Sequence, residues 1–251
     1  MKLSALCSYL NTSLNVSKIR DYCPNGLQVE GRNEIHTIIT GVTACQDLID
    51  AAIEMDADAI LVHHGYFWKG EPEPIVGIKK QRIQSLLKHD ISLLAYHLPL
   101  DMHPTLGNNA QLAEILALTV EGNINPEDSS VPGLIGRLPY AMGASEFAEY
   151  IARCLGREPQ HIGEADDMIE TIAWCTGAAE SYMHYAINQG IDAYLTGEIN
   201  EPSVHLARES GTHFYGAGHH ATERYGIKAL GEHLAQKFAL DVHFIDIDNP
   251  V

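Results

Sequence analysis

The chain has 251 residues, enough to bury a substantial core in one large α/β unit or in two smaller ones. Its 33 acidic and 16 basic residues give a formal net charge of -17, which disfavours duplex nucleic acid and anionic membranes as direct partners. The five cysteines form no C-x-x-C pair, and no apolar run reaches the roughly 18 residues that a membrane helix needs. We therefore expect a soluble, unexported protein of the reducing cytoplasm.

Apolar spacing predicts helices and strands in alternating order from the N-terminus. An opening amphipathic helix runs through Leu3, Leu6, Leu10 and Leu14. A turn at Pro24-Asn25-Gly26 follows. Beyond it the pattern predicts strands at 37–42, 58–62 and 91–96, separated by helices at about 45–55 and 79–89. Strands that alternate with helices in this way are typical of parallel α/β packing.

The sequence also matches itself when it is shifted by 134 positions. The shift pairs Thr37-Ile38 with Thr171-Ile172, Ala52-Ile53 with Ala186-Ile187, and Asp58-Ala59-x-Leu61 with Asp192-Ala193-x-Leu195. Both copies alternate strand, helix and strand in the same order, which favours an ancient duplication over a chance match. We therefore predict two pseudo-symmetric α/β halves, 1–124 and 125–251, with a ligand cleft between them at the carboxyl ends of the strands.

The first candidate ligands are two adjacent histidines, His63 and His64, which follow the apolar run 57–62. Neutral imidazole binds divalent transition metals well. Adjacent side chains of a regular strand point to opposite faces, so the strand must end here for both rings to reach one centre, and Gly65 permits that departure. The alternative is that one ring packs or caps while the other hydrogen-bonds, which is the commoner fate of an isolated pair.

A second candidate group follows the strand predicted at 91–96. Asp101 lies in a proline-bracketed loop, with His97 at the start of the same segment. An aspartate in such a loop is usually a turn former, and a lone histidine there often only satisfies backbone groups. Position at a strand end favours a functional interpretation of Asp101.

The third group is Gly218-His219-His220-Ala221-Thr222-Glu223, at the start of an amphipathic helix. His219 and Glu223 are four residues apart and share a helix face, which places the carboxylate to bridge two ions. His220 points about 100° away from His219, so we do not expect it to bind metal directly. Because no cysteine accompanies these histidines, an open catalytic site for zinc, manganese or iron is favoured over a closed thiolate zinc site.

The ordered motifs resemble the NGG-interacting-factor-three-like family, whose bacterial members are described as type 2 homologues of GTP cyclohydrolase I. The motifs are Asn25-Gly26-Leu27-Gln28-Val29-Glu30-Gly31, His63-His64-Gly65, His97-Leu98-Pro99-Leu100-Asp101, Thr196-Gly197-Glu198 and Gly218-His219-His220-Ala221-Thr222-Glu223. The resemblance runs from about residue 20 to the C-terminus. It implies a duplicated α/β fold, a ring-shaped homohexamer, and a dinuclear metal centre with the ligands His63, His64, Asp101, His219 and Glu223.

The same resemblance implies hydrolysis by metal-activated water, with attack on the imidazole portion of a guanine nucleotide and release of formate. His97 and Glu198 are candidates for transferring protons or orienting metal ligands. No residue pattern identifies guanine independently, and no Walker-type phosphate loop is present. Two alternatives stay open: a metal-dependent phosphoesterase, and a non-enzymatic metal-binding or regulatory homo-oligomer.

Overall fold

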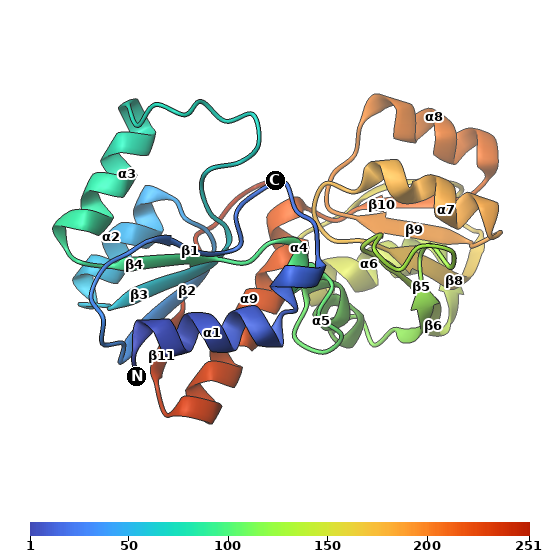
Figure 1. Cartoon of the computed structure of the whole chain (residues 1–251). Coiled ribbons are helices and arrows are strands. Elements are labelled where there is room, and N and C mark those ends of the chain that lie inside the picture. The colour runs from blue at the N-terminus through green and yellow to red at the C-terminus, as the bar shows by residue number, and fades with distance from the viewer. The chain divides into compact units, whose positions relative to one another are not determined.

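The computed structural model describes residues 1–251 as two compact units, each with its own sheet (Figure 1). Unit 1 comprises residues 1–107 and 226–248, and unit 2 comprises residues 108–225 and 249–251. This division differs from the contiguous halves 1–124 and 125–251 expected from the sequence. Residues 226–248 join unit 1 because strand β11, Asp241–Phe244, pairs with β2, Thr37–Thr43, in the first sheet. Residues 108–124 join unit 2 because β5, Thr119–Asn123, pairs with β6, Leu134–Gly143, in the second sheet.

Unit 1 holds a five-stranded sheet in the order β1-β4-β3-β2-β11. Besides β2 and β11, its strands are β1 Gly26–Val29, β3 Ala59–His64 and β4 Ser92–Ala95. Only β1 is antiparallel to its neighbour. The residues of β3 and β4 are almost all buried, as expected for parallel strands covered on both faces.

Helices cover both faces of the unit 1 sheet (Figure 1). The helical segments are α1 Leu3–Ser13, η1 Val16–Lys18, α2 Gln46–Glu54, α3 Gly77–Lys88, α4 Leu98–Asp101 and the part of α9 (His219–Phe238) from Gly226 onward. Apolar residues of α1 and α9 share one core, and those of α2 and α3 form the other. The helical spacing of leucines from Leu3 to Leu14 is thus explained by burial against this sheet.

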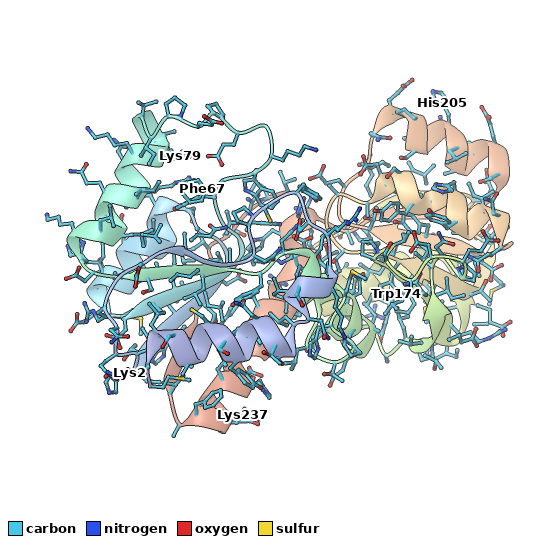
Figure 2. All side chains as sticks on the ribbon, in the orientation of Figure 1. Lys2, Phe67, Lys79, Trp174, His205 and Lys237 are labelled. Atoms are coloured by element: carbon cyan, nitrogen blue, oxygen red, sulfur yellow. The ribbon has the colours of Figure 1, made fainter.

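Unit 2 holds a six-stranded sheet in the order β5-β6-β8-β9-β10-β7. Its strands are β5 Thr119–Asn123, β6 Leu134–Gly143, β7 Gln160–Ile162, β8 Met168–Trp174, β9 Ala193–Thr196 and β10 His213–Gly216. Its helices are α5 Asn108–Ile115, α6 Ala144–Leu155, η2 Glu180–Tyr182, α7 Met183–Asn188 and α8 Glu201–Ser210. Trp174, labelled in Figure 2, is fully buried in the core formed with α5 and α6.

The predicted elements are confirmed, with ends that differ by one to a few residues. No helix combines the length and the apolar character that crossing a bilayer requires.

Strand register confirms the duplication. In unit 1, Ala59 pairs with Ile38 on one side and Ser92 on the other. In unit 2, Ala193 pairs with Ile172 and His213 in the same way. The parallel strands β2-β3-β4 and β8-β9-β10 therefore repeat one arrangement.

Each repeat has one aspartate at an equivalent position that links two neighbouring strands by hydrogen bonds. Asp58 Oδ2 accepts hydrogen bonds from the amides of His36 and Thr37 at 2.7 and 2.9 Å. Asp192 Oδ2 accepts from the amides of Glu170 and Thr171 at 3.0 and 2.8 Å. The self-match of the sequence thus reflects a carboxylate that ties the start of one strand to the start of its neighbour.

Removing the charge of Asp192 tests this role. Burial would raise the pKa of Asp192, but hydrogen bonds from Thr171 and Glu170 lower it overall. We expect Asp192→Asn to lower the free energy of unfolding by about 1.5–3 kcal/mol, the range for hydrogen bonds to charged groups. The difference from wild type should be full above the unfolded pKa of about 3.9 and shrink as the pH falls below it.

Urea denaturation between pH 3 and pH 7 measures both effects, with the exposed Glu209→Gln on α8 as the control. A loss of stability that is the same at pH 3 and pH 7 would show that the carboxylate charge is not what fastens the strands.

Candidate functional site

Predicted ligands gather in unit 1 where β3 and β4 end. Ring centroids lie 4.5 Å apart for His63 and His64, and 5.0 Å apart for His63 and His97. Nitrogen atoms of these three rings lie within 4.8 Å of one another, a spacing that could hold a metal ion. His63 Nε2 lies 3.5 Å from Asp101 Oδ1. We call His63, His64, His97 and Asp101 the unit 1 cluster.

The first two rings of the unit 1 cluster are held through Nδ1. His63 Nδ1 lies 3.0 Å from the carbonyl oxygen of Tyr96, and His64 Nδ1 lies 3.2 Å from Thr43 Oγ1. A carbonyl oxygen can only accept, so His63 carries its proton on Nδ1 and, in the neutral ring, a lone pair on Nε2. That lone pair and the Asp101 carboxylate oxygen are both electron donors. Two electron-pair donors that lie this close together are typical of ligands that share one cation. His63 and Asp101 are therefore suited to bind a metal ion.

His97 is held by a carboxylate that the sequence analysis missed. Its Nδ1 lies 3.0 Å from Asp21 Oδ1, and the Asp21 side chain is only 3% exposed. Burial would raise the pKa of Asp21, but hydrogen bonds from His97, Asn25 and Leu98 hold it well below its usual value. Asp21 precedes the family motif that begins at Asn25, and no spacing rule links it to His97, 76 positions later.

Cys23 lies beside Asp21 and His97, and these three residues could also hold a metal ion by their spacing. Burial and the neighbouring Asp21 charge raise the pKa of Cys23 to about 12. The sulfur therefore stays a protonated thiol at neutral pH, whereas the thiolate is the form that binds metals and attacks electrophiles.

The motif Asn25 to Gly31 supports the unit 1 cluster by fixing the loops that carry it. Asn25 Oδ1 accepts the His97 amide at 2.7 Å, and Gln28 Oε1 accepts the Tyr66 amide at 2.7 Å. A Cβ at Gly65 would collide with the Gln28 side chain. Strand β3 ends at His64, the position at which the sequence predicted that the strand must end. The lack of a side chain at Gly65 lets the Gln28 side chain approach the backbone closely.

A second group forms in unit 2, where β9 ends and α9 begins. His219 is the first residue of α9, and its Nε2 lies 2.9 Å from Glu223 Oε2 one turn later. His219 Nδ1 lies 2.6 Å from Glu198 Oε1 in the loop after β9. We call Glu198, His219 and Glu223 the unit 2 cluster. His220 lies outside it and donates its backbone amide to the Val251 carbonyl.

Glycines allow the close packing of the unit 2 cluster. A Cβ at Gly177 would collide with the Glu223 carboxylate, and one at Gly197 would collide with the His219 backbone. Gly218 has a φ of 98°, a backbone conformation that residues with a side chain rarely adopt, and the chain turns here into α9. The glycines of the Thr196-Gly197-Glu198 and Gly218-to-Glu223 motifs thus have a steric reason.

The charge of His219 depends on its two carboxylate partners. Burial alone would lower the pKa of His219, but Glu223 and Glu198 raise it to about 9. Without metal, the ring therefore carries a proton on both nitrogens at neutral pH, between two carboxylates. A divalent cation would take the place of the Nε2 proton.

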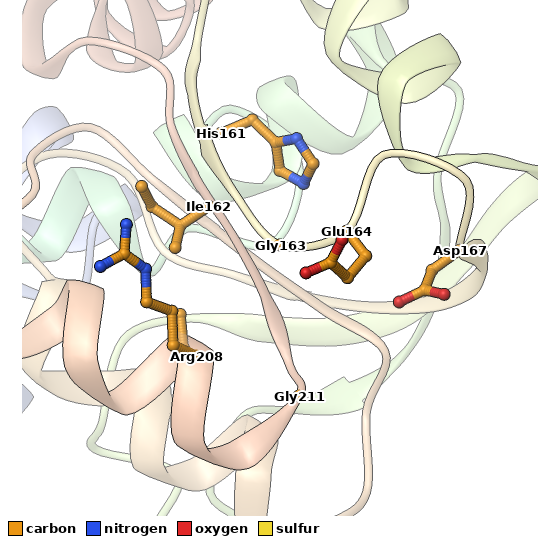
Figure 3. A pocket seen from close by; sticks show the side chains of 8 residues that line it. His161, Ile162, Gly163, Glu164, Asp167, Arg208 and Gly211 are labelled. Carbon is orange, nitrogen blue, oxygen red and sulfur yellow. The ribbon is translucent and has the colours of Figure 1, made fainter.

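Unit 2 also has a cavity of about 390 Å³, which is separate from the unit 2 cluster (Figure 3). His161, Glu164, Asp167 and Arg208 are among the side chains that line it, and no residue of the unit 2 cluster is. The seven predicted site residues thus form two groups: four in the unit 1 cluster and three in the unit 2 cluster.

We predict that Glu198→Gln lowers the pKa of His219 in the metal-free protein by about 1–3 pH units, because one of two charged partners becomes neutral. The pKa of His219 in the wild type is raised to about 9. The protonated ring therefore contributes fully to the stability of the folded protein below about pH 6.5, and this contribution is lost as the pH rises through 9.

An NMR titration of the His219 ring measures this pKa directly. The control is Glu201→Gln, which removes the exposed partner of His205 at 3.2 Å and should leave His219 unchanged. An equal pKa of His219 in wild type and Glu198→Gln would contradict the pairing.

Comparison with known proteins places the chain. The family model described as Duf34/NIF3 (NGG1p interacting factor 3) matches residues 1–250. A Pseudomonas aeruginosa protein named GTP cyclohydrolase 1 type 2 homolog is 54% identical over 248 residues, which cover 99% of this chain and 98% of the relative. A Vibrio cholerae protein of the same name is 53% identical over 253 residues, covering 100% and 99%.

Two solved structures agree in fold over their whole lengths. The structure described as protein ybgI, of unknown function, has a TM-score of 0.96 at 50% identity and covers 100% of both chains. A crystal structure of a Thermus thermophilus protein has a TM-score of 0.89 at 32% identity, also with full coverage. The chain therefore belongs to the Duf34/NIF3 family.

Proposed function

We propose that the unit 1 and unit 2 clusters together bind two divalent cations, and that water activated there hydrolyses a nucleotide-like substrate. The observation that carries the proposal is the pairing of an imidazole nitrogen with a carboxylate in each unit. His63 Nε2 faces Asp101 at 3.5 Å, and His219 Nε2 faces Glu223 at 2.9 Å. In each ring Nδ1 is already engaged, which leaves Nε2 to bind metal.

The donor set supports zinc, manganese or iron. The proposed ligands are His63, His64, Asp101, His219 and Glu223, a mixture of imidazole and carboxylate that these metals share. Glu223 has two oxygens and is the proposed bridge between the ions. The proposal requires the two clusters to meet at one centre.

Each chain residue has a defined task in this proposal. Bound divalent cations would lower the pKa of a water from about 15.7 toward about 7 and polarise the bond under attack. Glu198 orients His219 through its Nδ1 proton, and the Tyr96 carbonyl does the same for His63. His97 adds a third imidazole to the unit 1 cluster, where it can accept a hydrogen bond or a proton.

The name of the relatives supports the choice of substrate. They are called homologues of a GTP cyclohydrolase, so we propose opening of the imidazole ring of a guanine nucleotide, with release of formate. The family resemblance also leads us to propose a ring-shaped homohexamer in the cytoplasm.

Metal stoichiometry tests the shared centre. We expect two ions per wild-type chain after dialysis against zinc or manganese, counted by elemental mass spectrometry. Glu223→Gln should weaken the binding of both ions by roughly tenfold or more. Even the loss of a residue that only hydrogen-bonds a ligand lowers metal affinity by about 10–100-fold. The exposed Glu232→Gln, on the same helix, is the matched control.

A Glu223→Gln variant that loses only one ion, or neither, would rule out a carboxylate shared by both ions. Full occupancy of two ions in a wild-type chain without any turnover would favour the non-enzymatic metal-binding role.

Product analysis tests the reaction. Metal-loaded protein incubated with a panel of purine nucleotides should release formate from a guanine nucleotide, with no inorganic phosphate. His63→Ala should abolish that release, because it removes an ion ligand and leaves the Asp101 carboxylate without the ring nitrogen 3.5 Å away.

Inorganic phosphate in place of formate would identify a phosphoesterase instead. Formate release that persists in His63→Ala would separate the reaction from the metal centre.

A further inference from the structure

We propose that Asp21 is a positioning residue that fixes the tautomer and the plane of the His97 ring, so that Nε2 of His97 serves the unit 1 cluster. The role of this nitrogen in catalysis rests on the proposed function. The placement of the proton does not, because it follows from contacts within unit 1.

The Asp21 carboxylate is surrounded by hydrogen-bond donors. Its Oδ1 accepts the Tyr22 amide at 2.7 Å and faces His97 Nδ1 at 3.0 Å. Its Oδ2 accepts the Leu98 amide at 2.9 Å and the Asn25 side-chain amide at 2.9 Å. Three of these four partners can only donate, so the carboxylate is held in place by groups other than the imidazole.

Two aromatic rings pack against the His97 ring. Trp68 meets it edge-on with centroids 4.9 Å apart, and Tyr22 does the same at 5.0 Å. Trp68 is itself anchored by its Nε1, which donates to the Gly65 carbonyl at 3.0 Å. Asn25 fixes the backbone of His97 by accepting its amide at 2.7 Å.

This arrangement decides where the ring proton lies. An ionised carboxylate can only accept, so the proton stays on Nδ1, and the lone pair of the neutral ring lies on Nε2. The His97 ring centroid is 5.0 Å from that of His63 and 5.8 Å from that of His64. Nε2 therefore adds a third basic nitrogen to a cluster in which His63 already has a proton fixed on Nδ1.

A substitution of Asp21 by Asn should reverse the tautomer. The Oδ2 position faces two obligate donors and lies 3.3 Å from His97 Nδ1, whereas Oδ1 faces one obligate donor and lies closer to that nitrogen, at 3.0 Å. The amide nitrogen of Asn is therefore expected at the Oδ1 position, where it donates to Nδ1 and leaves the His97 proton on Nε2.

Nitrogen-15 NMR of the histidine rings in the metal-free full-length chain tests this directly. The His97 signals are assigned by their loss in His97→Gln. We expect wild-type His97 to be protonated at Nδ1, and Asp21→Asn to move the proton to Nε2. Asp192→Asn is the matched control, because Asp192 also binds two backbone amides but contacts no residue of the unit 1 cluster.

A wild-type His97 protonated at Nε2 overturns the proposal, as does an unchanged tautomer in a folded Asp21→Asn. If Asp21→Asn does not fold, the wild-type spectrum alone decides. A wild type that binds no zinc would refute the proposed function, whereas the metal-free spectrum would still judge the role of Asp21.

Discussion

The candidate site depends on one constraint: the Nδ1 atom of each proposed imidazole is held by a group in its own unit. The Tyr96 carbonyl holds His63, Thr43 holds His64, Asp21 holds His97 and Glu198 holds His219. A ring held at Nδ1 keeps its orientation before any ligand arrives, so binding metal does not require ordering a mobile side chain. Three of these partners are carbonyl or carboxylate oxygens, which are groups usually found behind metal-binding histidines, and the fourth is the Thr43 hydroxyl.

The duplicated arrangement of strands brings the side chains of each cluster close together. In each repeat, parallel strands end side by side, so the loops after neighbouring strands carry side chains toward the same edge. The Tyr96 amide, for example, donates to the Val62 carbonyl, and the Ala217 amide donates to Thr196 in the equivalent place. In unit 1 the loop after β4 thereby brings His97 and Asp101 to the histidine pair. In unit 2 the same position begins α9 with His219, one turn before Glu223.

Much of the fold could be predicted because local spacing carries it. Leu3 to Leu14, the run before His63 and the self-match at Asp58 and Asp192 each leave a periodic or repeated signal in the sequence. The placement of His63, His64, Asp101, His219 and Glu223 at strand ends and at a helix start followed from the same signals. Asp21, Thr43 and the Tyr96 carbonyl could not be predicted, because their contacts join positions 21 to 76 residues apart without a pattern. The return of β11 to the first sheet was missed for the same reason.

The unit 1 and unit 2 clusters lie after equivalent strands of a duplicated fold, and the proposed function requires both of them to bind the same pair of ions. The direct test is a crystal structure of the zinc- or manganese-loaded protein, with the ions located by anomalous scattering. We expect two ions about 3.5–4 Å apart, with His63 and Asp101 on one ion, His219 on the other and Glu223 between them. A single ion enclosed by four protein ligands, or separate ions confined to the two units, would contradict a shared centre.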